Sequence, residues 1–339
     1  MDLYPLLMAP SFRHGAETPW GGHMLRDAMM KDAPEDATGE SLEVSILPGH
    51  ESTVANGTHA GQTLTRMVEL WGEALTGQAE GDFPLLLKIL DPVTPLSVQV
   101  HPDDAFAQAH ENHPCGKTEA WIVLNAEPGS RIVYGVDTKG ESLETIVREG
   151  RIEDCLRWQN VRPGDVFYIP SGMIHTLGEG VLVYEIQESC DLTYRFWDWD
   201  RVDEQGNRRE LHVEKALQVC KPDLRLEKIE GTTVLCKGGS RTYYISDNHF
   251  ELCRLNLSGT MPLESGRMLL LTPLTPCELR WGEESMTLNA FDSVLVPAAL
   301  EGVSLAGETK VLMSSLPDQE ALRQELGYRA ENVAGLMEE

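Results

Sequence analysis

The sequence has 339 residues with 54 acidic and 28 basic side chains, a formal net charge of -26 and a hydrophobic content of 41%, which is typical of a globular protein. This charge argues against nucleic acid and anionic membranes as partners, and no apolar stretch reaches the roughly 20 residues that a membrane-spanning helix needs. Seven scattered cysteines and the absence of a visible secretory signal predict reduced thiols in a cytoplasmic protein.

The first part of the chain mixes strand signals with two helical segments. In chain order, the patterns predict a strand at 39–48, a helix at 63–75, strands at 84–90, 96–101, 120–124 and 131–136, a helix at 142–158, and strands at 166–169 and 181–187. Thr63 is a suitable N-cap for the first helix, and Gly150 is a candidate break in the second.

A charged stretch at 203–228, with a short helix at 212–219, separates this part from a second series of strands. These are predicted at 243–245, 250–257, 267–272, 277–281, 286–288, 293–296, 303–305 and 310–314, followed by a helix at 318–326. Residues 289–297 repeat the rhythm of 161–170, but no histidine follows the second copy. We therefore expect two domains, one with a helical insertion at 1–235 and a similar one at 236–339. The candidate metal-binding and catalytic residues described below all lie in the first, and the second is expected to lack a metal site.

The spacing of the strands predicts the fold class. Many short strands at intervals of 8 to 12 residues are typical of β-sandwiches and jelly-roll barrels. The sequence therefore predicts an all-β protein with minor helical insertions, built from two jelly-roll β-barrels.

Four polar side chains in these strands form a candidate metal site. Gln99 and His101 are two residues apart on a predicted strand, so they share one face while the valines beside them point the other way. Glu119 lies in an otherwise apolar strand, and His175 follows a Pro-Ser-Gly turn. Each residue taken alone is more often structural than a ligand. Together, two imidazoles, a carboxylate and an amide suit a divalent cation, most often zinc, with positions open for water or substrate.

Basic residues within apolar or aromatic sequence are candidate anion contacts. Lys88 interrupts the apolar run 84–90, and a buried ammonium group is costly unless it meets an anion. Lys117 and Arg195 complete a basic island in this acidic chain. Residues 185–201 interleave charges with aromatic side chains, which suggests a pocket wall, although an amphipathic strand with its aromatic residues inward gives the same pattern.

Four longer motifs occur in order along the chain. They are Leu-Ser-Val-Gln-Val-His-Pro-Asp-Asp at 96–104, Gly-Lys-Thr-Glu at 116–119, Pro-Ser-Gly-Met-Ile-His-Thr-Leu-Gly at 170–178 and Thr-Tyr-Arg-Phe-Trp-Asp-Trp-Asp-Arg at 193–201. Together they resemble the motifs of class I mannose-6-phosphate isomerases, in the shorter bacterial form of these cupin-fold zinc enzymes. The resemblance runs from Trp20 to Arg201 and is weaker through the C-terminal half. It implies that both predicted barrels are cupins.

The resemblance also implies roles for individual residues. The zinc-ligand positions, for one Zn²⁺ per chain with other divalent ions possible, fall on Gln99, His101, Glu119 and His175. Arg195 matches an active-site arginine, Glu185 a carboxylate of the same pocket, and Lys117 a substrate-contacting lysine. Lys88 and Arg201 are further candidates for contact with a phosphate group.

The implied reaction interconverts mannose 6-phosphate and fructose 6-phosphate through a cis-enediol, without a redox cofactor. Glu185 is a candidate for moving the proton, and Arg195 is better suited to stabilising anionic oxygen because its guanidinium stays protonated. Three alternatives remain open: a metal cupin with other chemistry, such as a dioxygenase, a non-catalytic sugar-phosphate-binding cupin, and an isomerase of another sugar phosphate. The expected partner is a small sugar phosphate, with no nucleic acid and no membrane, bound by a monomer or homodimer.

Overall fold

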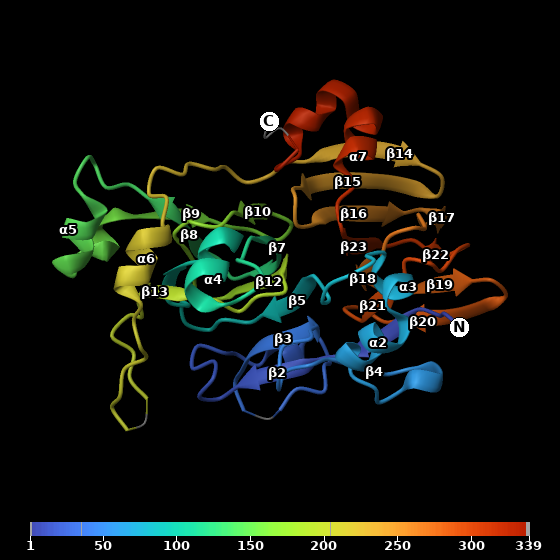
Figure 1. The fold of residues 1–339 in the computed structure, drawn as a ribbon, viewed down its shortest axis with the longest axis horizontal. Coiled ribbons are helices and arrows are strands. Elements are labelled where there is room, and N and C mark those ends of the chain that lie inside the picture. The colour runs from blue at the N-terminus through green and yellow to red at the C-terminus, as the bar shows by residue number, and fades with distance from the viewer. Residues whose placement is uncertain (1, 35, 204, 337–339) are drawn as a thin grey trace. The chain divides into compact units, whose positions relative to one another are not determined.

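The structure is a computed structural model that describes residues 2–34, 36–203 and 205–336, and it consists mainly of antiparallel strands (Figure 1). The chain divides into two compact units, each formed by separate segments. Unit 1 contains Met1–Ser11, Leu42–Leu87 and Ile229–Glu339, and unit 2 contains Phe12–Ser41 and Lys88–Lys228. The predicted domains 1–235 and 236–339 are consecutive, whereas these units alternate along the chain, because strand patterns do not show which sheet a strand joins.

Unit 1 contains a large and a small antiparallel sheet. Across the large sheet the strands are β14 (Thr232–Cys236), β15 (Gly239–Ser246), β16 (Glu251–Leu257), β23 (Lys310–Ser315), β18 (Leu269–Pro273), β21 (Ser293–Val296), β1 (Leu6–Ala9) and β4 (Thr53–Val54). Across the small sheet they are β17 (Gly259–Pro262), β22 (Ser304–Gly307), β19 (Cys277–Trp281) and β20 (Glu284–Leu288). Figure 1 shows β14, β15 and β16 as successive neighbours. In the large sheet, Leu6 of β1 pairs with Leu295 of β21.

The apolar faces of these two sheets form one core. Leu255 and Leu271 from the large sheet belong to the same buried cluster as Leu279 and Leu305 from the small sheet. Two sheets that face each other across such a core make a sandwich. Within the described residues, neither strand order closes on itself, so these are open sheets and not a closed barrel. The prediction of a jelly-roll fold is confirmed in that two antiparallel sheets face each other.

Unit 2 takes its strands from two further antiparallel sheets. The first has the order β10 (Val166–Ile169), β7 (Glu119–Ala126), β12 (Val181–Glu188), β5 (Leu85–Leu90), β3 (Thr38–Val44) and β2 (Ser11–His14). The second has the order β13 (Tyr194–Trp197), β6 (Val98–Val100), β11 (His175–Leu177), β8 (Arg131–Val136) and β9 (Leu156–Asn160). The boundaries between the two units fall at the start of β2, within β3 and β5, and between Lys228 and Ile229.

The second sheet of unit 2 has apolar residues on both faces. Ile132 and Leu177 pack with Trp121 and Phe167 of the first sheet in one buried cluster. Val98, on β6, belongs to another cluster that includes residues of α5 (Leu143–Arg148) and α6 (Val213–Val219). The valines of β6 therefore pack away from the inter-sheet core, which leaves the opposite face of this strand for its polar residues.

The predicted helix at 63–75 is present but interrupted. It forms α2 (Leu64–Trp71) and α3 (Glu73–Thr76), which meet at Gly72 with a φ of 48°. Thr63 caps α2, because its side chain accepts a hydrogen bond from Arg66 N at 3.2 Å. The remaining helices are α1 (Met24–Asp27), α4 (Asp104–Glu111) and α7 (Gln319–Leu326), and short 3₁₀ turns lie at Gly57–His59, Ile152–Cys155 and Gly327–Asn332.

The prediction of a helix over 142–158 is wrong in its second half. Helix α5 ends at Arg148, and Gly150 adopts a φ of 71° that a continuing helix does not allow. Residues 156–160 form β9, which pairs with β8. Hydrogen bonding to a neighbouring strand thus outweighs the helical spacing of the apolar residues in this short segment.

The weak repeat in the sequence corresponds to a repeated turn. Asp165 accepts a hydrogen bond from Arg162 N at 3.1 Å just before β10, and Asp292 accepts one from Asn289 N at 2.7 Å just before β21. Each strand then ends before a proline. The same turn chemistry therefore starts a strand in each unit, and only the copy in unit 2 leads to His175.

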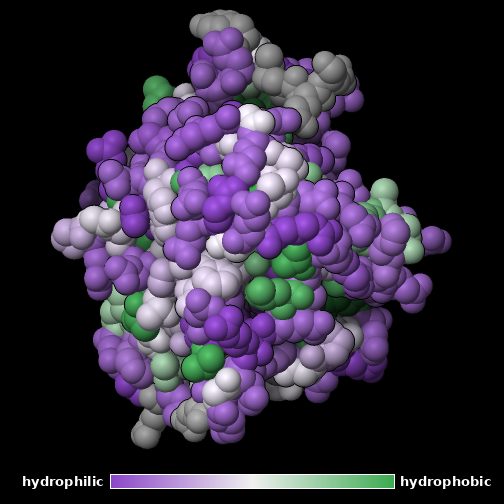
Figure 2. All heavy atoms as spheres, turned by 90° about the vertical axis from the view of Figure 1, so that its left-hand side faces the viewer, coloured by the Kyte–Doolittle hydropathy of each residue, from purple (hydrophilic) through white to green (hydrophobic). Residues whose placement is uncertain are grey.

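The surface is consistent with the acidic composition. Hydrophilic residues cover most of the face drawn in Figure 2, and the hydrophobic areas on it are small and separate. Among the described residues, no helix has both the length and the apolar character needed to span a membrane.

Candidate active site

Two neighbouring strands of one sheet of unit 2, β6 and β11, and strand β7 of the other sheet bring the predicted metal-site residues together. Gln99 lies on β6 directly opposite His175 at the start of β11. His101 follows the end of β6, and Glu119 is the first residue of β7. The side chains of His101, Glu119 and His175 are fully buried, and one ligand atom from each lies within 4.8 Å of the others.

The two imidazoles share one orientation toward the carboxylate. Nδ1 of His101 donates to the carbonyl oxygen of Leu192 and Nδ1 of His175 donates to that of Met173, both at 2.8 Å. Since a neutral imidazole carries a single N–H, each Nε2 presents a lone pair. Nε2 of His101 lies 3.4 Å from Glu119 Oε2, and Nε2 of His175 lies 3.2 Å from Oε1. Lone pairs from three side chains therefore meet in a buried space.

The electrostatics of this cluster suit a cation. Burial, together with the charge of Lys117, lowers the pKa of His101 to about 3, so this imidazole is neutral at pH 7. Burial acts to raise the pKa of Glu119, but Lys117 and the two histidines together outweigh burial and hold the pKa well below its usual range. Lys117 Nζ lies 2.8 Å from Glu119 Oε2. Even so, His101 Nε2 and both Glu119 oxygens lack a well-aligned hydrogen bond from the described residues. Such orphaned buried lone pairs fit a metal ion.

Gln99 lies beside the imidazoles with its amide nitrogen toward them. Its Nε2 is 3.4 Å from His175 Nε2, while its Oε1 accepts a hydrogen bond from Ser97 Oγ at 3.1 Å. The side chain is only partly buried and also lines the neighbouring cavity. It therefore stands between the histidine cluster and the space where a substrate would bind.

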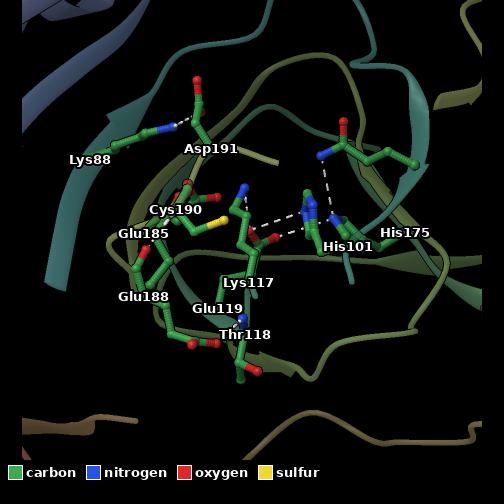
Figure 3. A network of polar contacts seen from close by, with 12 residues as sticks. Lys88, His101, Lys117, Thr118, Glu119, His175, Glu185, Glu188, Cys190 and Asp191 are labelled. Carbon is green, nitrogen blue, oxygen red and sulfur yellow. Dashed lines mark hydrogen bonds and ion pairs between the residues drawn. The ribbon is translucent and has the colours of Figure 1, made fainter. Parts of the chain in front are cut away.

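Glu185 and Lys117 lie on the cavity side of the cluster. In the view of Figure 3, Lys117 and Glu119 lie between the imidazoles and Glu185. Trp121 Nε1 donates to Glu185 Oε2 at 2.8 Å. Burial and the negative charge of Glu119 raise the pKa of Glu185 to about 7, although Lys117 and Lys88 act in the opposite direction. A carboxyl group with such a pKa can both accept and return a proton near neutral pH.

Lys88 meets the anions that its buried position requires. Its ammonium lies 3.3 Å from Glu40 Oε2 and 3.5 Å from Asp191 Oδ1 (Figure 3 shows the Asp191 contact). Burial acts to lower the pKa of Lys88, but these two carboxylates raise it overall, so the group is charged. Arg13 binds the same acids, with Nη2 at 2.7 Å from Asp191 Oδ2 and Nη1 at 3.3 Å from Glu40 Oε2.

The arginines that follow β12 divide into two groups. Arg195, opposite Gln99 on β13, lines the cavity together with Arg209, and its Nε has no hydrogen-bond partner among the described residues. Burial and the charge of Arg209 lower the pKa of Arg195. Arg201 lies outside the lining of this cavity and binds Asp198 at 2.9 Å and the carbonyl oxygen of Pro95 at 2.6 Å. Asp198 also binds Arg209.

The cavity therefore contains most, but not all, of the predicted residues. Those that line it are Lys88, Gln99, Lys117, Glu185 and Arg195. The prediction missed Arg13, Glu40, Asp191 and Arg209, which line it as well. Asp191 and Arg209 lie in charged sequence near the recognised motifs, which is a weak signal. Arg13 and Glu40 carry no local signal, because the chain reaches the cavity there only through tertiary packing.

Comparisons with known proteins identify the family of the chain. Residues 13–123 match the family described as "Phosphomannose isomerase type I, catalytic domain". The mannose-6-phosphate isomerase ManA of Bacillus subtilis (strain 168) is 37% identical over 322 residues, which is 93% of this chain and 100% of that protein. The mannose-6-phosphate isomerase of Streptococcus mutans is 34% identical over 301 residues, covering 87% of this chain and 94% of the relative.

Solved structures give the same result. The mannose 6-phosphate isomerase from Bacillus subtilis superposes with a TM-score of 0.85 at 32% identity, covering 91% of this chain and 99% of that one. The apo enzyme from Salmonella typhimurium, at 14% identity, covers 94% of this chain and 100% of its own with a TM-score of 0.72, and so shares the fold. With full-length relatives above 30% identity, the chain belongs to the type I phosphomannose isomerase family.

Proposed function

We propose that this enzyme interconverts mannose 6-phosphate and fructose 6-phosphate. The family supports this reaction, and one observation in the site carries it: a buried His–Glu–His cluster with orphaned lone pairs adjoins a cavity that contains basic side chains and a carboxyl group with a pKa near 7. An aldose–ketose isomerase needs these three elements, since it must polarise sugar oxygens, bind a phosphate group and move a proton between two carbons.

The buried cluster is the proposed site of one zinc ion per chain. Its ligands would be His101, Glu119 and His175, together with Gln99. Rotating the Gln99 amide by half a turn would exchange its oxygen and nitrogen and bring Oε1 toward the cluster. Two neutral imidazoles and a carboxylate are ligands that suit Zn²⁺. When bound, the ion would polarise the oxygens on C1 and C2 of the open-chain sugar. The hydrogen bonds from each Nδ1 to a carbonyl fix the tautomer that such binding needs.

Glu185 is the proposed proton carrier. In its deprotonated form it would take the proton from C2 of the open-chain aldose, which leaves an enediolate, and protonation of O1 would give the cis-enediol. O2 would then lose its hydroxyl proton, and Glu185 would return its proton to C1, which completes the ketose. Trp121 orients the carboxyl group through its hydrogen bond to Oε2. Arg195 lines the same cavity and stays protonated, so it would stabilise negative charge that develops on the substrate oxygens.

The phosphate group would meet the basic side chains of the cavity. Lys88 and Lys117 line it and are the proposed contacts. Arg201 does not line it, but it shares Asp198 with Arg209, which does. We therefore infer that Arg201 acts indirectly, by holding the carboxylate that positions Arg209.

A coupled assay for fructose 6-phosphate tests the reaction and its metal requirement together. Enzyme loaded with Zn²⁺ should form fructose 6-phosphate from mannose 6-phosphate, and a chelator should abolish this activity until zinc is restored. Absence of product from the loaded enzyme would contradict the proposal. If only a different aldose phosphate gave product, that sugar phosphate would be assigned as the substrate in place of mannose 6-phosphate. Recovery with Mn²⁺ or Co²⁺ in place of Zn²⁺ would change the assigned metal and leave the reaction intact.

A further inference from the structure

A second group of metal-ligating side chains lies beside the candidate active site. His113 and Cys115 lie in the segment between α4 and β7, and Cys190 follows the end of β12. One ligand atom from each of the three lies within 4.8 Å of the others. Figure 3 draws Cys190 in the network that contains Lys117 and Asp191. None of the three belongs to the His101–Glu119–His175 cluster, so their convergence needs its own explanation.

The surroundings of the two sulfur atoms are polar. Cys190 is fully buried, and its Sγ accepts a hydrogen bond from Leu192 N at 3.4 Å. Cys115 is partly buried, and its Sγ lies 3.7 Å from the carbonyl oxygen of Ser189. A buried cysteine with only a packing role more often has apolar neighbours. The two thiols here instead face each other, backbone polar groups and an imidazole.

The two thiols lie close enough to influence one another. The hydrogen bond from Cys115 lowers the pKa of Cys190 to about 7, although burial opposes this shift. The same contact, with burial, raises the pKa of Cys115. A divalent cation that binds both sulfur atoms would displace the thiol protons.

The imidazole completes the set of soft donors. His113 Nδ1 lies 4.0 Å from Cys115 Sγ and 2.8 Å from the carbonyl oxygen of Cys115. A metal ligand must present a lone pair, so Nδ1 can bind only in the tautomer that gives up its hydrogen bond to this carbonyl. Two sulfur atoms and one ring nitrogen within 4.8 Å match the ligand types of tetrahedral zinc, with a fourth position left for water.

We propose that His113, Cys115 and Cys190 form a second metal site, which binds one thiophilic divalent cation of the zinc type. Binding forms two metal–sulfur bonds and one metal–nitrogen bond, and the protons of the thiols leave to solvent. No electron is transferred. Cys115 lies two residues before Lys117, and Cys190 immediately precedes Asp191, so the ion would tie together two segments that line the active-site cavity.

Titration with Co²⁺ tests this site without relying on activity. Cobalt bound by thiolates gives a sulfur-to-metal charge-transfer absorption in the near ultraviolet, which a site made of imidazole and carboxylate does not give. The reduced, metal-free full-length chain should show this absorption and should bind a second equivalent of Co²⁺ beyond the one expected at His101 and His175. Zn²⁺ should displace the cobalt and remove the absorption.

Variants separate this site from the first one. Cys115→Ser and Cys190→Ser should lose the charge-transfer absorption and the second equivalent, whereas His101→Ala should keep the absorption. If a cysteine variant fails to fold, His113→Asn offers a milder test. This change should weaken cobalt binding at least tenfold and alter the visible spectrum. Cys236→Ser, at an exposed cysteine on β14, is the matched control and should behave as the unaltered chain.

Three results would overturn the proposal. The first is the absence of charge-transfer absorption in the reduced chain. The second is an absorption that survives replacement of both Cys115 and Cys190, since it would then come from other cysteines. The third is a chain in which peptide mapping finds a Cys115–Cys190 disulfide and reduction yields no cobalt binding, because the pair would then be a redox pair and not a metal site. Each result is independent of isomerase activity.

Discussion

Replacing Lys88 by Met tests whether the buried ammonium is held by Glu40 and Asp191. The lysine side chain is 3% exposed, and the Glu40 side chain is 12% exposed. The substitution keeps an apolar stem of similar length and removes the charge. Both carboxylates then depend on Arg13, which already binds them.

The expected loss of stability follows from the exposure of the two acids. Breaking a fully buried ion pair costs roughly 3–5 kcal/mol, because the remaining charge stays buried. The Asp191 side chain is 41% exposed, so its contact with Lys88 is worth only about 0.2–1 kcal/mol. With Arg13 still in place, we expect a total loss of about 2–3 kcal/mol. For a unit of this size that corresponds to a melting temperature lower by roughly 4–12 °C.

Thermal unfolding followed by circular dichroism measures this effect, and two variants control it. Lys215→Met removes a lysine that also contacts a carboxylate, 2.7 Å from Glu111, but its side chain is 47% exposed. An exposed pair contributes about 0.2–1 kcal/mol, so this change should shift the midpoint by no more than about 4 °C. Lys88→Met combined with Glu40→Gln should be more stable than Lys88→Met alone, because the second change removes a carboxylate and leaves Arg13 with a single acid, Asp191, to neutralise. Equal midpoints for Lys88→Met and Lys215→Met, or no recovery in the double variant, would refute the reasoning.

Four further outcomes are expected. Glu185→Gln should slow exchange of the substrate C2 proton with solvent by roughly 10²–10⁴-fold, and undiminished exchange would exclude Glu185 as the base. Burial raises the pKa of Glu251 more than Arg267 lowers it, so the folded unit holds this proton more tightly than the unfolded chain, and the contribution of Glu251 to stability falls as the pH rises from about 4.5. Glu251→Gln should therefore make the urea midpoint less dependent on pH between pH 4 and 6. An unchanged dependence of the midpoint on pH would contradict the assignment. Ser293→Ala removes the 2.8 Å hydrogen bond to Glu43 and should cost about 1.5–3 kcal/mol in urea unfolding, whereas a loss below about 0.5 kcal/mol would show that this contact is weak. Zn²⁺ at 100 times its dissociation constant should add about 2.7 kcal/mol of stability, which chelation should reverse, and a melting temperature insensitive to chelator would argue against a resident ion.

The local sequence pattern predicted the strand that carries Gln99 better than it predicted the residues from distant segments that surround the site. The alternation of polar and apolar residues predicted that Gln99 and His101 share one face. The structure has Gln99 on β6 and His101 directly after its end, and Val98 packs in the cluster on the other side of the strand. This worked because a strand has a period of two residues wherever it lies in the fold. The pairing of Gln99 with His175 depends on sheet order, which local pattern does not contain.

The parts that the sequence did not predict depend on contacts between distant segments. Arg13 binds Asp191, and no local feature of either residue indicates the other. Arg201 belongs to a recognised motif, yet it lies outside the cavity lining because Asp198 and the carbonyl oxygen of Pro95 hold it. Residues 156–160 have helical spacing but pair with β8. In each case tertiary partners decide the outcome, and a sequence pattern reports only local preference.

The pairing of Leu6 with Leu295 has a consequence for the order of folding during synthesis. Strand β1 lies between β21 and β4 in the large sheet of unit 1, so its partner β21 leaves the ribosome only when most of the chain has been made. The longest segment of unit 2, Lys88–Lys228, emerges well before that. We therefore expect the part of the protein that contains the candidate active site to fold first, while the N-terminal strand waits with an unpaired edge. Such late, long-range pairing slows folding and exposes the nascent chain to aggregation.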